Sequence, residues 1–287
     1  MRYFRKLYWI IIISGFLFVL PVKALTISPA KALITTERGD KQNLSIQVYN
    51  EGAEAIVIEP VVLGYRQSRD GLPLLDQDIG PAEKWVVFSG SSFELSAGGE
   101  QSVDFEINVP EDAYPGSHYL ALGVKSSAPT GQVGVASQLA CLLTLQVAGT
   151  AVEQLDINSF QSAGVVWYKD WTFQVRLKNN GNVELPLSGV IKILDKKDKI
   201  VDEQEFYFGN QLLAGAVRNL TPTWSWGEKW LWPGIYQAEL VIDYGLTRQQ
   251  SISNVNIVYI PVWSLIGVVF LLVVIIGLIY FLKRKRK

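Results

Sequence analysis

The sequence has very few of the residues that most enzymes use for nucleophilic catalysis and metal binding. It contains one cysteine, Cys141, and one histidine, His118, among 287 residues. A disulfide needs two cysteines, and a structural zinc site needs four ligands drawn mainly from Cys and His. Internal disulfides and Cys/His zinc sites are therefore excluded, and Cys141 and His118 do not have a plausible spacing for a Cys–His pair. A Ser-His-Asp site would have to use His118.

Charged residues are also scarce, and they are unevenly distributed. They make up 18% of the chain against 49% hydrophobic residues, which is apolar for a purely soluble protein. Of the 26 basic residues, four lie before residue 25 and five after residue 282, whereas all 27 acidic residues lie between. Because a middle segment with an acidic excess repels phosphate backbones, nucleic-acid binding is disfavoured.

The first 24 residues have the layout of a secretory signal. Arg2, Arg5 and Lys6 precede the apolar stretch Leu7–Leu20, and Val22-Lys23-Ala24 is a small-x-small cleavage pattern. We predict a signal peptide over residues 1–24 that is cleaved after Ala24. An uncleaved N-terminal anchor is the alternative.

The C-terminal end has the features of a membrane anchor. Residues 261–282 contain no charged side chain, and at 1.5 Å per residue they span the roughly 30 Å hydrocarbon core of a bilayer. We predict a transmembrane helix over residues 258–282 and a basic cytoplasmic tail over residues 283–287. The chain is then a single-pass protein of the cell membrane with residues 25–257 outside the cell.

The segment between these ends shows the two-residue periodicity of β-strands. Alternating apolar residues place one face of each strand in a core, and Gly- and Asn-containing turns separate the strands. Four runs show this most clearly: Leu44/Ile46/Val48, Val103/Phe105/Ile107/Val109, Leu139/Cys141/Leu143/Leu145/Val147 and Trp171/Phe173/Val175/Leu177. Only residues 81–88 suggest a single helical turn. The pattern predicts an all-β fold of antiparallel, immunoglobulin-like sandwiches.

An internal repeat divides this β segment into two domains. Val48-Tyr49-Asn50-Glu51-Gly52 corresponds to Leu177-Lys178-Asn179-Asn180-Gly181, and Pro115-Gly116 corresponds to Pro233-Gly234. We therefore predict two tandem sandwich domains, at residues 25–149 and 150–257.

Two tryptophans within the second repeat are the candidate ligand-binding residues. Aromatic faces stack on sugar rings, so Trp230 and Trp232, which precede Pro233-Gly234, are candidates for binding a cell-wall glycan. Packing in the protein interior is the alternative for both. Trp224 and Trp226 align with core positions of the first repeat, so we expect them to be buried. The long polar segment Arg66–Lys84 is a second candidate for ligand binding.

The remaining polar candidates favour structural roles. We expect His118 to lie at the surface or pair across strands, and Cys141 to be buried. Asp76-Gln77-Asp78 offers too few oxygens for calcium, which takes six to eight. Adjacent carboxylates on a strand point to opposite faces, which makes Glu111/Asp112 and Asp202/Glu203 poor catalytic pairs. We predict no enzyme activity, catalytic residue, metal or cofactor.

Several segments of the first domain resemble a known family. They are Leu25–Lys31, Gln47–Gly52, Ala82–Val86, Phe93–Glu100 and Val109–Gly116. They are similar to the N-terminal domain of the WxL-interacting surface proteins of Gram-positive bacteria. The resemblance implies a bacterial protein with a peptidoglycan-binding first domain, a second immunoglobulin-like domain that engages a host surface, and a C-terminal anchor. It also implies a link to secreted WxL-domain proteins.

These observations predict a non-catalytic adhesion or scaffold protein at the cell surface. Its partner would be a cell-wall polymer (peptidoglycan) or a secreted surface protein, which the chain anchors to the membrane. The alternative is a chaperone-like assembly factor for surface proteins that uses the exposed edge strands of its sandwiches, because sheet edges bind extended chains through main-chain hydrogen bonds.

Overall fold

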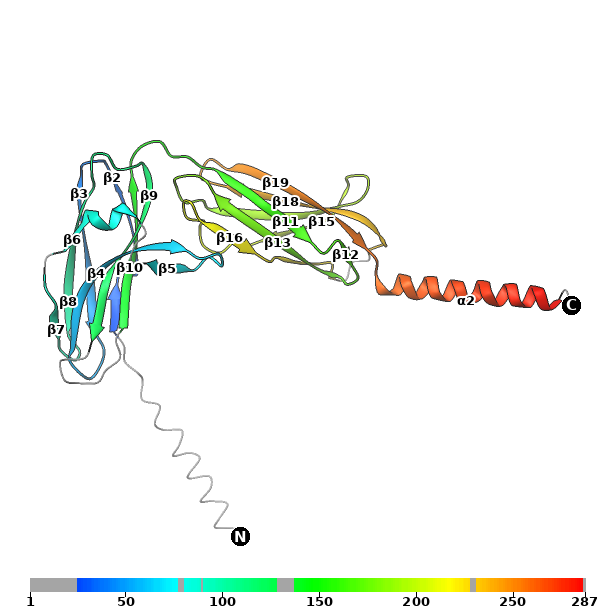
Figure 1. The fold of residues 1–287 in the computed structure, drawn as a ribbon, viewed down its shortest axis with the longest axis horizontal. Coiled ribbons are helices and arrows are strands. Elements are labelled where there is room, and N and C mark those ends of the chain that lie inside the picture. The colour runs from blue at the N-terminus through cyan, green and yellow to red at the C-terminus, as the bar shows by residue number, and fades with distance from the viewer. Residues whose placement is uncertain (1–24, 77–79, 89, 128–136, 228–230, 286–287) are drawn as a thin grey trace, which may run out of the picture.

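The computed structural model describes residues 25–76, 80–88, 90–127, 137–227 and 231–285 (Figure 1). The predicted signal peptide with its cleavage site after Ala24, Gln77-Asp78, Trp230 and the last two residues of the basic tail lie outside these ranges. Strands in several sheets form most of the described chain, and one long helix follows them. The prediction of a mostly β protein is confirmed.

The N-terminal part of the chain forms two sheets. Sheet A has the order β1-β3-β8-β6, with bounds Leu25–Ser28, Lys41–Asn50, Glu100–Asn108 and Val86–Phe88. Sheet B has the order β2-β10-β9-β4-β5, with bounds Lys31–Thr36, Ser137–Val147, Gly116–Ser127, Ile56–Gln67 and Pro73–Asp76, and β7 (Phe93–Leu95) pairs with β4. The pairing of β2 with β10 is parallel. A 3-10 helix at Pro81–Trp85 matches the predicted helical turn.

The C-terminal part forms two further sheets. Sheet C has the order β11-β13-β16, with bounds Leu155–Ser162, Asp170–Asn179 and Val217–Leu220, and β17 (Thr223–Ser225) also pairs with β13. Sheet D has the order β12-β19-β18-β14-β15, with bounds Val165–Val166, Gln249–Tyr259, Gly234–Tyr244, Leu187–Leu194 and Ile200–Phe206. We call sheets A and B the N-terminal sheet pair, and sheets C and D the C-terminal sheet pair. The predicted domain boundary falls in the connection between β10 and β11 and stays a prediction.

Each sheet pair has its own hydrophobic core. In the N-terminal pair, Ile46 and Phe105 of sheet A pack with Leu143 of sheet B, and all three are fully buried. In the C-terminal pair, Phe173 and Leu177 of sheet C share a core with Leu240 of sheet D. The buried residues are the ones that alternate in the sequence, because successive strand residues face opposite sides of a sheet.

Three tryptophans form the centre of the C-terminal core. Trp171, Trp224 and Trp226 are at most 2% exposed. The ring of Trp226 is perpendicular to that of Trp224, with a centroid distance of 4.0 Å, and lies 5.5 Å from that of Trp171. Edge-to-face contacts of this kind are favourable for aromatic rings. The prediction that Trp224 and Trp226 belong to the core is confirmed.

The repeated Asn-x-Gly motif has the same role in both sheet pairs. Asn50 donates from Nδ2 to the carbonyls of Glu54, Leu95 and Ser96 and accepts the Gly52 N–H at Oδ1. Asn179 donates to the carbonyls of Val183 and Leu212 and accepts the Gly181 N–H. Both asparagines are buried, so each one replaces water for backbone groups of a loop.

The long helix α2 extends over Val262–Lys285. It starts later than the predicted residue 258, because β19 continues to Tyr259 and pairs there with Gly234. An 18-residue window within residues 262–284 has a mean hydropathy of 3.2, and the helix is long and apolar enough to cross a membrane. None of that stretch is buried against the sheets.

We expect Asn179→Ala to lower the free energy of unfolding of the C-terminal sheet pair by about 2 kcal/mol, because two buried carbonyls and one N–H lose their partner. Thermal unfolding of the full chain in detergent, followed by tryptophan fluorescence, reports this change, since Trp171, Trp224 and Trp226 lie in the affected core. Asn254→Ala, at an exposed position on β19, is the control. Equal midpoints for the two variants would contradict the role of Asn179.

Candidate functional site

The structure separates the predicted ligand-binding residues. Trp232 is 66% exposed, and its ring centroid lies 6.2 Å from that of Trp263 at the start of α2. The segment Arg66–Lys84 instead carries the β4–β5 hairpin, which contacts the other end of the C-terminal sheet pair through Asn219. Trp230 lies outside the described residues. Glycan binding by Trp230 and Trp232 stays a prediction.

The polar candidates have structural surroundings. The Nε2 atom of His118 lies 2.9 Å from the Tyr114 carbonyl oxygen, and its ring packs on Trp85. Cys141 is fully buried, and burial raises the pKa of its thiol to about 11, which keeps it protonated and unreactive. Asp76 pairs with Arg66 at 3.7 Å. Within the described ranges, no three His, Cys, Asp or Glu residues are grouped to hold a metal ion.

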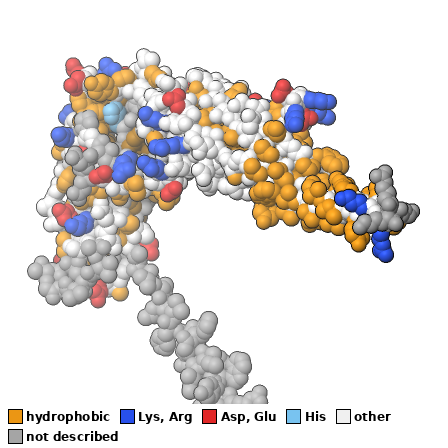
Figure 2. Space-filling model, turned by 45° about the vertical axis from the view of Figure 1, so that its right-hand side comes forward, with side chains coloured by type: hydrophobic (Ala, Val, Ile, Leu, Met, Phe, Trp, Pro, Cys, Tyr) orange, Lys and Arg blue, Asp and Glu red, His pale blue; other side chains and the backbone are white. Residues whose placement is uncertain are grey.

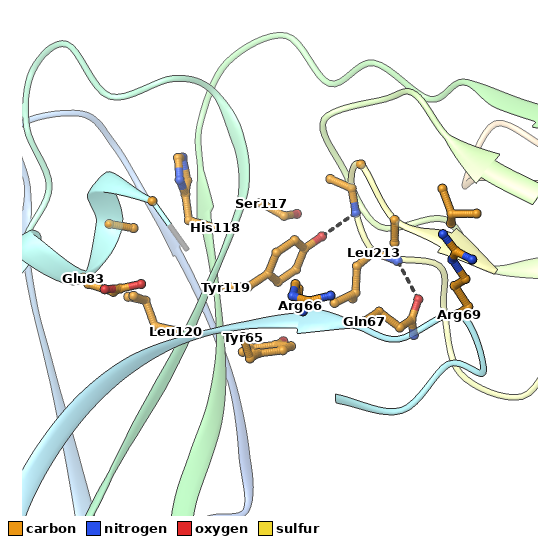
Figure 3. A pocket seen from close by; sticks show the side chains of 16 residues that line it. Tyr65, Arg66, Gln67, Arg69, Glu83, Ser117, His118, Tyr119, Leu120 and Leu213 are labelled. Atoms are coloured by element: carbon orange, nitrogen blue, oxygen red, sulfur yellow. Dashed lines mark hydrogen bonds between the residues drawn. The ribbon is translucent and has the colours of Figure 1, made fainter. Parts of the chain in front are cut away.

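A crevice of about 480 Å³ lies where the two sheet pairs meet (Figure 3). Tyr119 of β9 and Gln67 of β4 point from the N-terminal sheet pair toward the loop that carries Leu213. The Tyr119 hydroxyl accepts the Ala214 N–H at 2.8 Å, and Gln67 donates to the Gln211 carbonyl at 3.0 Å. Burial raises the pKa of Tyr119, so the hydroxyl stays neutral. These contacts fix one sheet pair against the other.

The β4–β5 hairpin strengthens this junction. Its turn contains Gly71 at a φ of +86°, a conformation that glycine adopts without strain. The Arg69 carbonyl accepts the Asn219 N–H at 2.7 Å. A Cβ atom at residue 71 would lie 3.2 Å from Nε of Arg218. The hairpin therefore packs directly on β16.

Arg218 is a buried cation that organises the loop beneath the hairpin. It is 2% exposed and donates to the carbonyls of Phe208, Asn210 and Gln211. Burial lowers the pKa of its guanidinium, since the charge is removed from water. The carbonyl oxygens offset part of that cost. Arg218 thus holds the loop in the conformation that receives Gln67 and Tyr119.

The first half of β10 is an open sheet edge. On one side, Ser137–Cys141 pair with β9. On the other side, β2 pairs with β10 only from Leu142 to Val147, where Leu142 donates to the Ala30 carbonyl at 3.0 Å. Because backbone groups alternate along a strand, the N–H and C=O groups of Gln138 and Ala140 point to the side that β2 does not reach. Among the described residues, no strand pairs with them there; β1 passes nearby but hydrogen-bonds to β3.

An apolar surface adjoins this open edge on the outer face of sheet B. Ala140 and Leu142 pack there with Leu63, Tyr65 and Leu213. Leu33 of β2, on the same face, is 67% exposed. A second crevice of about 480 Å³ lies beside Leu33 and Leu142 and extends to Leu213 of the C-terminal sheet pair. The edge thus combines unpaired main-chain groups with apolar contacts for alternate side chains of a bound strand.

Comparison with known proteins shows distant likeness to pilus chaperones. The chain has 12% identity and a TM-score of 0.45 to a structure of a chaperone–tip adhesin complex of CFA/I fimbriae, covering 83% of this chain and 99% of that one. It has 13% identity and a TM-score of 0.41 to the E. coli chaperone DraB, covering 80% of this chain and 96% of DraB. It has 12% identity and a TM-score of 0.39 to the CsuC–CsuE chaperone–tip subunit complex of Acinetobacter baumannii, covering 83% of this chain and 99% of that one. Likenesses at this level do not support a function.

No protein-family model and no curated protein matches the chain. The resemblance to WxL-interacting proteins, with the peptidoglycan, WxL-protein and host-surface binding that it implies, therefore stays a prediction. The function has to be argued from the geometry of this chain.

We expect Tyr119→Phe to loosen the junction, because the Ala214 N–H loses its acceptor at a cost of about 1.4 kcal/mol, and amide hydrogen exchange in residues 211–216 then rises roughly tenfold. Mass spectrometry of the full chain in detergent measures this exchange. Tyr207→Phe, at a tyrosine that is 87% exposed, is the matched control. Unchanged exchange in that segment would show that the Tyr119 contact does not hold the two sheet pairs together.

Proposed function

We propose that this chain is a non-catalytic assembly factor of the cell surface that binds an extended segment of a partner polypeptide at the open edge of sheet B. The observation that carries the proposal is the half-covered β10 strand, in which Ser137–Cys141 pair with β9 alone among the described strands. The proposal favours the chaperone-like alternative over adhesion to a cell-wall polymer.

Strand addition explains how one edge can serve different partners. The main-chain groups of Gln138 and Ala140 hydrogen-bond an incoming strand whatever its sequence. Alternate side chains of that strand then lie beside Ala140 and Leu142 on the outer face of sheet B, which selects apolar residues at every second position. Such a site suits a segment that is not yet folded, because a folded partner has already paired most of its own strands.

An open edge also needs a reason to persist. Unpaired edges promote aggregation, and proteins usually cover or charge them. In sheet B the parallel strand β2 covers the second half of β10, and β5 occupies the opposite border. The first half of β10 is left for a partner.

Helix α2 supports a location at the membrane. Its length and apolar composition suit a membrane span, and it follows directly after sheet D. The basic residues at its end favour a cytoplasmic C-terminus. The chain then holds its partner outside the membrane, which suits assembly of surface proteins.

A proline at the open edge tests the proposal. Gln138→Pro removes an N–H that faces away from β9 and leaves the pairing with β9 intact, whereas Gln138→Ala shortens the side chain and keeps the N–H. A photo-crosslinking amino acid at position 31, the exposed first residue of β2 opposite Leu142, reports the bound segment in the native envelope. We expect Gln138→Pro to lower the yield of crosslinked polypeptide about tenfold, since a lost hydrogen bond and a clash cost about 1.4 kcal/mol.

Two controls make the result decisive. Gln138→Ala is expected to keep the wild-type yield, and Gln138→Pro is expected to keep the wild-type unfolding temperature. If both variants crosslink as wild type does, or if position 31 gives no polypeptide adduct, strand addition at this edge is wrong.

A further inference from the structure

We propose that the end of the C-terminal sheet pair next to α2 is a lipid-binding surface that lies in the headgroup region of the bilayer. The surface is a collar of four aromatic side chains: Trp167, Tyr168, Trp232 and Trp263. The inference rests on the membrane-anchoring part of the proposed function and extends it, because it brings the folded sheets themselves into contact with lipid.

The exposed tryptophans gather at this end of the molecule. Trp167 and Trp263 are 41% and 40% exposed, and Trp232 is 66% exposed. Tyr168 is 73% exposed. Most other tryptophans of the described chain are buried in the two cores. Trp and Tyr prefer the membrane–water interface, because each ring has a large apolar body and one polar group.

Hydrogen bonds from the core hold the collar in place. The buried Trp171 donates from Nε1 to the Tyr168 carbonyl at 3.1 Å. The Ile260 N–H donates to the Val166 carbonyl at 2.9 Å, which ties the loop of Trp167 to the end of β19. The Tyr236 hydroxyl donates to the Trp232 carbonyl at 2.8 Å. The rings are therefore presented by ordered backbone rather than by a free loop.

The collar is continuous with the helix. Only Ile260 and Pro261 separate β19 from α2. The ring centroid of Trp263, in the first helical turn, lies 6.2 Å from the ring centroid of Trp232. The Pro261 carbonyl accepts both the N–H and the hydroxyl of Ser264, which fixes the start of the helix. Figure 2 shows hydrophobic side chains extending from the sheets onto α2 as one area.

This continuity selects lipid as the occupant. When α2 spans a bilayer, Trp263 lies at the interface, and the two connecting residues keep the collar close enough to reach it, since each residue extends the chain by at most about 3.6 Å. A hollow of about 440 Å³ between Trp167, Leu231 and Val262 offers apolar walls to acyl chains or glycerol. Lys169 also lines this hollow and is exposed; its Nζ donates to the Gly227 carbonyl at 3.1 Å, and its remaining N–H groups can reach lipid phosphates.

Spin-label accessibility of the full chain tests this inference. The chain carries Cys141→Ala and a single spin-labelled cysteine, and it is reconstituted in vesicles of equal parts phosphatidylcholine and phosphatidylglycerol. Labels at positions 168 and 232 probe the collar. A label at position 207 is the matched control, because Tyr207 is an 87% exposed tyrosine at the other end of the same sheet pair. We expect a water-soluble nickel reagent to reach the collar labels about fivefold less than the control, because lipid excludes it.

A label at Ile275, in the middle of α2, separates the two ideas. If it is accessible to oxygen but not to nickel while positions 168 and 232 match position 207, the helix spans the membrane and the collar proposal is wrong. If position 275 is open to nickel, membrane anchoring itself is wrong. As a second measure, Trp167→Ser with Trp232→Ser should raise nickel access at position 168 to the control level. No change there would also overturn the proposal.

Discussion

Backbone N–H and C=O groups removed from water must find hydrogen-bond partners, and this constraint shapes the protein from one end to the other. Within the sheets, hydrogen bonds between neighbouring strands satisfy these backbone groups. Where loops cross the cores, side chains do so: Asn50 and Asn179 serve the two repeated turns, and Arg218 serves three carbonyls at the junction. In α2 the helix itself pairs its own groups, which allows a chain to cross lipid.

The open half of β10 is one of the strand edges where the described chain leaves this requirement to solvent or to a partner. The cause is the path of the first strands, since the chain follows sheet A through Ser28 and joins sheet B only at Lys31. Half of the β10 edge is covered as a result. A small difference in where β2 begins thus decides how much main chain is available for binding.

Local pattern in the sequence predicted the strands and the cores well. The alternating runs around Ile46, Phe105 and Phe173 are buried as expected, and the Asn-x-Gly repeat marks equivalent turns. Pairing between distant strands carries no such local signal. The parallel register of β2 on β10, the contact of Arg69 with Asn219 and the burial of Arg218 depend on residues far apart in sequence. The candidate site could therefore be foreseen only as an unspecified exposed edge.

The predicted tryptophan site also shows that contacts between distant residues cannot be predicted from local sequence. The sequence indicated that Trp232 lies beside a turn, and the structure shows that its side chain is exposed. The contact between Trp232 and Trp263, about thirty residues apart in the chain, could not be predicted from the sequence. The sequence gives the type of each side chain, whereas only the folded structure shows which side chains lie next to it. The same ring can serve a sugar or a lipid, and its neighbours decide between them.

The C-terminal sheet pair has a consequence for the range over which this protein can act. Its strands β18 and β19 extend for about 35 Å from the start of α2, and the contacts of Arg69 with Asn219 and of Tyr119 with Ala214 join the C-terminal sheet pair to the N-terminal one. Under the proposed function, the pair is a stiff strut between the membrane and the proposed binding edge. A partner tethered to the same membrane would meet that edge at an effective concentration set by the length of its own tether, and one with too short a tether would not reach it. The length of a partner's tether along the membrane normal, rather than the partner's sequence, then decides which partners can bind at the edge.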